Sequence, residues 1–213
     1  DGGFSFIHAD ELSEHVGVFD VVFMSSVVHE MLTPSCAPGA VANEELFELI
    51  GRLVAPSGCI VVRDWADYAV GAQDGLLPAF LDLVDEGAAR EVDQWVKAMG
   101  NSGVIREGAV TVSRSSGGWV LAGERASVCE VFLHAVWGLG SLDRESQERY
   151  YNEAFGSPGG FMQWFYGERG FAVEGAQVFY DEGFAHHGSR LFRLDDGLPC
   201  ATKVVTVLRK GVR

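Results

Sequence analysis

The stretch FDVVFMSSVVHE, residues 19–30, is the part of the sequence that decides the fold. Residues 19–26 form an apolar run that is rich in Val and Phe and closes on two serines, which is typical of a strand buried on both faces in a parallel sheet. A His-Glu pair follows, just beyond the carboxyl end of such a strand. The stretch is therefore either one strand of an ordinary core or the floor of a binding site.

A helix and a second buried run follow this stretch. Asn43 is positioned to open the helix, and APSG (55–58) supplies the Pro and Gly that end it. CIVVRDW (59–65) comes next and predicts a second buried strand. Strand, helix, tight turn and strand form an α/β crossover unit. Because such crossovers join parallel strands, residues 19–24 and 59–63 are predicted to be parallel neighbours in one sheet.

The middle of the chain, residues 66–140, is predicted to be a helical and hairpin insertion over one end of the sheet. Apolar residues recur at helical spacing over 77–84, 92–99 and 125–138. RSSG (114–117) lies between two strand-like runs and predicts a hairpin. The α/β pattern then returns. The predicted elements of that last part are helices over 143–155 and 157–169 and strands over 170–184 and 202–210.

The composition indicates a folded protein with an acidic surface. Of its 213 residues 47% are apolar, and 30 acids against 16 lysines and arginines give a net charge of −14. An acidic surface repels phosphate backbones, so nucleic acid is a disfavoured partner. No apolar run approaches the roughly 18 residues of a membrane helix, and no signal peptide is recognisable, so no membrane partner is expected.

The cysteine and histidine spacings do not indicate a metal site. The cysteines have neither zinc-site nor disulfide-framework spacing, and they lie at Cys36, Cys59, Cys129 and Cys200. We expect reduced thiols, which favours a cytoplasmic protein. His186 and His187 are adjacent and their side chains point apart, so no metal ligand is predicted there.

Taken in order, these elements resemble the latter two-thirds of a class I S-adenosylmethionine-dependent methyltransferase. Residues 4–65 resemble the third to fifth strands closely, with FSFIHAD (4–10) as a strand that ends at an acid. Residues 160–210 resemble the sixth strand and its surroundings loosely. The resemblance implies an α/β, Rossmann-like sheet that is incomplete at its N-terminus. It divides the chain into a partial core (1–65), the insertion, and a C-terminal α/β part (141–213).

The resemblance also implies a cofactor site for S-adenosylmethionine. Asp10 would accept a hydrogen bond from the adenine amino group, and Glu11 and Leu12 would flank the ring. Ser25 would line the cofactor through its backbone, and Ser26 would start the next turn. In open α/β sheets ligands lie beyond the carboxyl ends of the strands, where these residues are expected. The alternative for each is a loop residue that caps a helix or faces water.

The candidate catalytic residues are His29 and Asp64. Histidine titrates near physiological pH and is a common general base, although His29 could equally be a helix residue packed at the mouth of a pocket. Asp64 would orient a substrate group or only cap its strand.

The turn VWGLGSLDRE (136–145) contains Gly-x-Gly, but the residues before it have a helical period, which argues against a nucleotide loop. In some methyltransferases a Trp-Gly turn of this kind covers the substrate, so Trp137 and Arg144 are candidate substrate contacts. The insertion would then be a lid over the carboxyl ends of the strands. The alternative is that Trp95, Trp119 and Trp137 form a private core of the insertion.

The sequence departs from the family at its strongest signature. No segment resembles the first strand with its Gly-x-Gly loop, or the second strand with the acid that holds the ribose. The family's sheet order is 3-2-1-4-5-7-6, so the sheet would lose its centre. The chain is then a fragment of a larger enzyme, a chain that a partner completes, or a degenerate relative.

Two functions follow from this departure and stay open. The first is methyl transfer to an N or O nucleophile of a small-molecule or otherwise unknown substrate. The second is a non-catalytic binding or scaffold subunit that has lost the cofactor loop. A hydrolase is disfavoured because the chain lacks a Gly-x-Ser-x-Gly elbow.

By itself the chain is expected to bind S-adenosylmethionine weakly or not at all, because the glycine loop and the ribose-binding acid are absent. Isothermal titration calorimetry of the purified chain measures this affinity. A micromolar dissociation constant would show that other residues form a replacement site.

Overall fold

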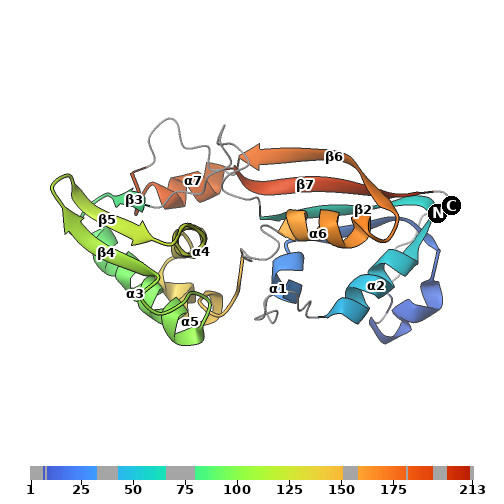
Figure 1. Cartoon of the computed structure of the whole chain (residues 1–213), viewed down its shortest axis with the longest axis horizontal. Helices are drawn as coiled ribbons and strands as arrows, with labels where there is room; N and C mark the ends of the chain where they lie inside the picture. Colours follow the sequence, from blue (N-terminus) through green and yellow to red (C-terminus); the bar gives the residue numbers. More distant parts are fainter. Residues whose placement is uncertain are drawn as a thin grey trace.

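The fold has two halves, each built around a sheet, in the part of the chain that the computed structural model describes (Figure 1). That part comprises residues 7, 9–32, 43–65, 80–150, 158–180, 182–193 and 201–211. One sheet has four strands in the order β1-β2-β7-β6, and the other has three in the order β3-β5-β4. The strands are β1 (Phe19–Ser25), β2 (Val54–Trp65), β3 (Phe80–Leu83), β4 (Val110–Ser115), β5 (Gly118–Gly123), β6 (Phe171–Tyr180) and β7 (Ala201–Lys210).

Helices pack against both sheets. The α-helices are α1 (Val28–Leu32), α2 (Glu44–Leu53), α3 (Glu86–Ser102), α4 (Arg125–Ala135), α5 (Leu142–Glu145), α6 (Pro158–Gly167) and α7 (Glu182–Gly188). Two short 3₁₀ helices are η1 (Ala9–His15) and η3 (Leu139–Ser141). No helix in the described ranges is both long and apolar enough to cross a membrane.

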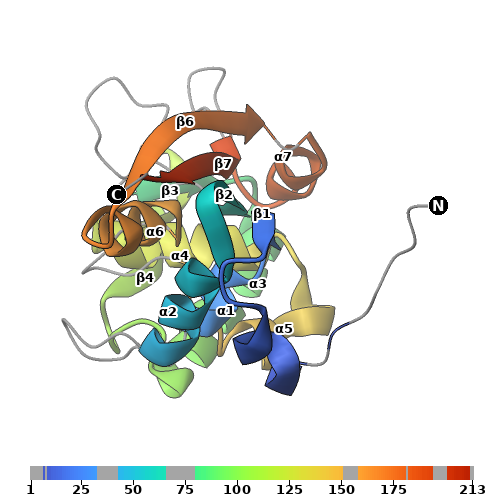
Figure 2. The same ribbon diagram turned by 90° about the vertical axis from the view of Figure 1, so that its right-hand side faces the viewer.

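The four-stranded sheet confirms the predicted crossover. β1 and β2 are parallel neighbours, with Val21 beside Cys59 and Ser25 beside Arg63. β7 pairs antiparallel with both β2 and β6, so the sheet is mixed. Figure 2 shows the four strands in this order from β6 to β1. Doubly apolar runs joined by one amphipathic helix are enough to specify such a pair.

One face of this sheet carries the core of the first half. Helices α1, α2 and α6 lie against it (Figure 1) and bury side chains such as Phe47, Ile60 and Phe165. The opposite face is different at β1, the edge strand, where Val21 is 55% and Phe23 61% exposed. The described helices therefore cover one side of β1 and leave the other accessible. The prediction that this strand is buried on both faces is wrong, because no described element packs on its second face and Met24 alone in β1 is buried.

The second half comprises the β3-β5-β4 sheet with α3, α4, α5 and α7, and it contains several of the elements predicted within residues 66–140. The pattern over 92–99 lies in α3, the pattern over 125–138 in α4, and the turn at 114–117 joins β4 to β5. This half has its own core, which buries Trp95 completely and packs against Trp119.

Four predicted elements are wrong in type or extent. The helical spacing over 77–84 belongs in part to β3, where Leu81 and Leu83 are buried and Phe80 and Asp82 exposed, a period of two; residues 66–79 lie outside the described part. Of the predicted helix over 143–155, residues 143–145 lie in α5, residues 146–150 are not helical and residues 151–155 lie outside the described part; the backbone N–H of Tyr150 donates to the Glu130 carboxylate.

The other two corrections concern strands. Asp10 lies in η1, a 3₁₀ helix, and not at the end of a strand; residues 1–6 and 8 lie outside the described part. The strand over 170–184 ends at Tyr180, where its pairing with β7 ends, and α7 follows so that Phe184 can pack on Phe132.

The second half lies beyond the carboxyl ends of β1 and β2, as the insertion was predicted to (Figure 1). Trp65, the last residue of β2, is buried in the core of the second half, and the Trp137 ring lies edge-on to it at 6.1 Å between centroids. The two alternatives for the tryptophans therefore apply to different residues. Trp95 belongs to a private core, whereas Trp137 faces the end of the sheet.

Gly58 is predicted to be necessary for the pairing of β1 with β2. A Cβ at this position would lie 2.8 Å from the Asp20 carbonyl oxygen and 2.9 Å from Val54 Cγ1, and the backbone oxygen cannot easily move. We expect Gly58→Ala to lower the free energy of unfolding by about 1–3 kcal/mol, measured by urea denaturation.

Gly100→Ala is the matched control for this change. Gly100 lies in α3, and a Cβ added there would have no described atom within 4 Å, so alanine should raise stability by about 0.5–1 kcal/mol. Equal effects of the two substitutions would contradict the close approach at Gly58.

Candidate functional site

A pocket of about 300 Å³ lies where the carboxyl ends of β1 and β2 meet the second half. Both halves contribute to its wall: Ser26, His29, Glu30, Trp65 and Lys203 come from the first, and Trp137, Arg144, Glu145, Glu148 and Tyr150 from the second. Ligands of open α/β sheets bind at this end of the strands. It is therefore the candidate functional site.

His29, which lines the pocket, is paired with Asp64 behind it. Asp64 is completely buried near the end of β2, and its Oδ1 lies 2.7 Å from His29 Nδ1. Its other oxygen accepts from the backbone N–H groups of Val28 at 2.9 Å and His29 at 3.3 Å. With Nδ1–H donating to the carboxylate, Nε2 is the basic nitrogen, and it points toward the Glu148 carboxylate 3.9 Å away.

The local backbone explains how this pair forms. β1 ends at Ser25 beside Arg63, and Ser26 takes a left-handed conformation with φ 51°. Its N–H donates to the Arg63 carbonyl oxygen at 2.7 Å, which turns the chain sharply over the end of β2. The first residues of α1 therefore begin directly at the Asp64 carboxylate, which caps their backbone N–H groups.

Aromatic rings form one wall of the pocket. Tyr150 is stacked between Trp65 at 4.8 Å and His134 at 4.0 Å, and the His29 ring meets Tyr150 edge-on at 4.9 Å. Trp137 is half exposed at the mouth of the pocket. Flat apolar walls with a few fixed polar groups are typical of sites for small organic molecules.

The second half supplies two of the three acids of the pocket, Glu145 and Glu148, and the third, Glu30, comes from α1. Burial alone would raise the pKa of the Glu145 carboxyl, but hydrogen bonds from the Tyr150 hydroxyl and from Arg144 outweigh it, so the pKa lies below the ordinary value. Burial, with the neighbouring Glu145 charge, raises the pKa of Glu148. Burial and the same Glu145 contact raise the pKa of Tyr150, which stays protonated and donates.

The structure brings together five of the residues that the sequence singled out. Ser26, His29, Trp137 and Arg144 line the pocket, and Asp64 lies behind His29. Ser26 Oγ accepts a hydrogen bond from Lys203 Nζ at 3.2 Å, so its hydroxyl is already engaged.

The remaining candidates lie elsewhere. Asp10, Glu11 and Leu12 are in η1 and are not among the residues that line this pocket. η1 ends just before β1 begins, and Gly17, two residues after it, donates to the Arg52 carbonyl near the end of α2 (Figure 1). Ser25 ends β1 with an exposed side chain outside the pocket lining.

Sequence reasoning missed several residues of the pocket. Glu148 and Tyr150 lie in a segment that was interpreted as a polar helix, and Lys203 lies in a strand that was predicted from its apolar run alone. A lysine next to a buried apolar run could have indicated a site, because a partly buried ammonium group needs an interaction partner. Here Lys203 Nζ lies 3.5 Å from the Trp65 ring centroid. Glu148 carried no such local signal.

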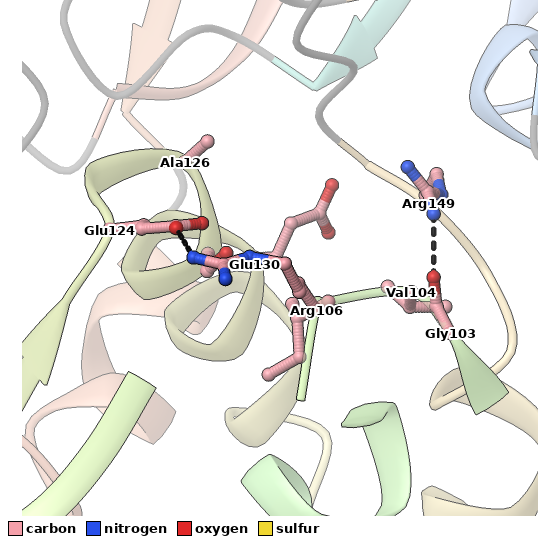
Figure 3. Close-up of a pocket in the computed structure, with 9 residues that line it drawn as sticks. Gly103, Val104, Arg106, Glu124, Ala126, Glu130 and Arg149 are labelled. Carbon is pink, nitrogen blue, oxygen red and sulfur yellow. Dashed lines mark hydrogen bonds and ion pairs between the residues drawn. The ribbon is translucent and has the colours of Figure 1, made fainter. Parts of the chain in front are cut away.

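A second pocket, of about 340 Å³, lies beside the start of α4 (Figure 3). Its charged side chains already have partners: Arg106 pairs with Glu124, Arg149 donates to the Gly103 carbonyl oxygen at 2.6 Å, and Glu130 accepts from the Tyr150 backbone. This second pocket lies away from the carboxyl ends of β1 and β2, so we favour the pocket at His29 as the functional site.

No family model, characterised protein or solved structure matches this chain. The methyltransferase resemblance therefore stays a prediction. The pocket and the topology of the sheet are therefore the observations that bear on the function.

Stability is predicted to fall in mild acid because of His134. This side chain is fully buried, its Nε2 has no hydrogen-bond partner among the described residues, and burial lowers its pKa from 6.5 to about 4. Between these two pH values the unfolded chain binds a proton that the folded chain does not. The free energy of unfolding should therefore decrease as the pH falls from 6.5 toward 4, by about 3 kcal/mol over the whole window.

Urea denaturation at several pH values between 7.5 and 4.5 measures this effect. His134→Phe keeps a ring to stack on Tyr150 and cannot be protonated, so it should remove most of the decrease. His186→Gln, at an exposed histidine of α7, should leave it unchanged. An unaltered pH dependence in His134→Phe would contradict the assignment.

Proposed function

We propose that the pocket at the carboxyl ends of β1 and β2 is the acceptor site of an S-adenosylmethionine-dependent methyltransferase. It would bind a small molecule and remove the proton from its hydroxyl or amine group. The observation that carries the proposal is the buried contact of 2.7 Å between His29 Nδ1 and Asp64, which leaves the basic Nε2 of His29 at the pocket. A histidine held in this way is the usual form of a general base.

The order of the strands supports the proposal that the four-stranded sheet is part of a Rossmann-like methyltransferase fold. In the family order 3-2-1-4-5-7-6 the last strand lies between the fifth and the sixth. Here β7, the last strand in the described part of the chain, lies between β2 and β6, and the full order β1-β2-β7-β6 corresponds to 4-5-7-6. Insertion of the last strand at this place is a specific topological feature, and composition alone does not predict it.

The described residues do not fit the methyl donor. The sequence lacks the Gly-x-Gly loop, and Asp10 and Glu11 are not in the pocket lining. The proposal for this chain is therefore limited to the acceptor. We propose further that a strand outside the described residues, in this chain or a partner, pairs with β1; the support is that β1 lies at the edge of the sheet among the described strands.

In the proposed step, an acceptor O–H or N–H donates its proton to His29 Nε2. Asp64 fixes the tautomer through Nδ1 and stabilises the imidazolium that results. The aromatic wall of Trp65 and Tyr150 orients the acceptor and keeps water away from it. A base in this position contributes about 10²–10⁴ in rate.

The test is transfer of a radiolabelled methyl group from S-adenosylmethionine to a panel of small phenols, alcohols and amines. It uses the chain together with any residues that its gene encodes before Asp1. His29→Gln should lower kcat by about 10²–10⁴, and Asp64→Asn by a similar factor because the amide no longer fixes the tautomer. His186→Gln is the control and should leave kcat unchanged.

The alternative is a non-catalytic scaffold subunit, which is favoured by the unpaired edge of β1 among the described strands and by a sequence without the first strand and its Gly-x-Gly loop. In that case no acceptor is methylated. Equal methylation rates in wild type and His29→Gln would contradict the role of His29 without contradicting methyl transfer itself.

A further inference from the structure

We propose that the same pocket binds a divalent transition-metal ion through His29 Nε2 and the carboxylates of Glu30 and Glu148. One ligand atom from each of the three lies within 4.8 Å of the other two. No spacing in the sequence predicted this group, because Glu148 is more than 100 positions away from the His-Glu pair. The inference goes beyond the acceptor site and does not depend on methyl transfer.

His29 is already arranged as a metal ligand. Protein histidines that bind metal almost always donate their other ring N–H to a carboxylate or carbonyl, which fixes the ring. Here Asp64 Oδ1 takes this place at 2.7 Å from Nδ1, and it also accepts from the Trp65 backbone N–H at 2.8 Å. The residue is buried, with only 5% of its surface exposed. Nε2 is the ring nitrogen on the side of the two carboxylates, where an ion would bind.

The ligand atoms lie slightly farther apart than in a bound metal site. His29 Nε2 and Glu148 Oε2 are 3.9 Å apart, whereas two metal–ligand bonds of about 2.1 Å at a tetrahedral angle place their ligand atoms about 3.4 Å apart. Metal binding therefore requires the Glu148 side chain to move closer to His29. Glu30 is exposed on the helix turn that carries His29, so a change of its side-chain rotamer can bring a carboxylate oxygen closer.

The charges in the pocket favour a cation at this point. Arg144 is paired with Glu145, which also accepts from the Tyr150 hydroxyl, and Lys203 is engaged with Ser26 and the Trp65 ring. Within the described ranges, no lysine or arginine lies at ion-pair distance from Glu30 or Glu148. Arg144 is near enough to offset part of the rise in the pKa of Glu148 but is paired with Glu145, so the two carboxylates beside His29 still repel each other, and a bound cation reduces that repulsion.

The ligand set selects the kind of metal. An imidazole nitrogen with two carboxylates suits Zn²⁺, Co²⁺ or Ni²⁺ better than Ca²⁺ or Mg²⁺, which prefer oxygen ligands alone. Three protein ligands leave positions open for water or for an oxygen of the acceptor. An ion on Nε2 excludes a proton from the same nitrogen, so metal binding and proton acceptance by His29 are mutually exclusive.

Titration of the metal-free chain with Co²⁺, followed by visible absorption and calorimetry, tests the site without donor or acceptor. We expect one Co²⁺ per chain and competition by Zn²⁺. Asp64→Asn should weaken the affinity by about 10–100-fold, and loss of a direct ligand in His29→Gln or Glu148→Gln by more than that. Glu148→Gln is decisive because its side chain is 22% exposed and outside a helix, so the fold should tolerate it.

Two controls separate this site from other Co²⁺ binding. Glu182→Gln changes an exposed acid of α7 that does not line the pocket, and it should leave the affinity unchanged. His186→Gln with His187→Gln removes the exposed pair of α7 and should do the same. No bound Co²⁺, or binding that survives Glu148→Gln and disappears with the α7 pair, would overturn the proposal. Neither result bears on methyl transfer, because no methyl donor is present.

Discussion

The buried carboxylate of Asp64 is the group on which the rest of the site depends. A charge at 0% exposure costs several kcal/mol unless it is fully paired, and Asp64 is held by the His29 ring and by three backbone N–H groups, of Val28, His29 and Trp65. These hydrogen bonds join the end of β2 to the start of α1. They also place the one histidine of the pocket and set which of its nitrogens faces the pocket. Both proposals for this site, proton acceptor and metal ligand, therefore rest on the same contact.

The second half of the molecule completes the site through an aromatic stack. Trp65 belongs to the sheet half by sequence and to the core of the second half by packing, and Tyr150 lies between it and the buried His134. This stack is continuous from the pocket to the interior of the second half. It explains why a neutral histidine is tolerated there although its Nε2 lacks a hydrogen-bond partner among the described residues. The ring contributes apolar stacking area, and the low pKa keeps it uncharged at neutral pH.

Much of the fold could be predicted because its periodicity is local. The apolar runs of β1 and β2, the amphipathic helix between them and the turn from β4 to β5 were all visible in short windows. The errors fall on short elements whose type is set by a distant partner. Phe80–Leu83 is a strand because β5 pairs with it, and in the segment predicted to be a polar helix the Tyr150 N–H donates to the distant Glu130 carboxylate. Propensity is a weak guide where a single long-range contact decides the outcome.

By itself the sequence determined that two apolar strands lie side by side and that Ser26, His29 and Asp64 fall at or just past their carboxyl ends, since the crossover rule needs only local patterns. Only the tertiary structure decided what those residues meet. Asp64 and His29 are 35 positions apart, and Ser26 and Lys203 are 177 apart, and no pattern within a short window links them. The same holds for Glu148, whose approach to His29 depends on how the second half packs over Trp65. Periodicity specifies which way a side chain faces along its own element, whereas the chemistry of a pocket depends on which elements are brought to the same point.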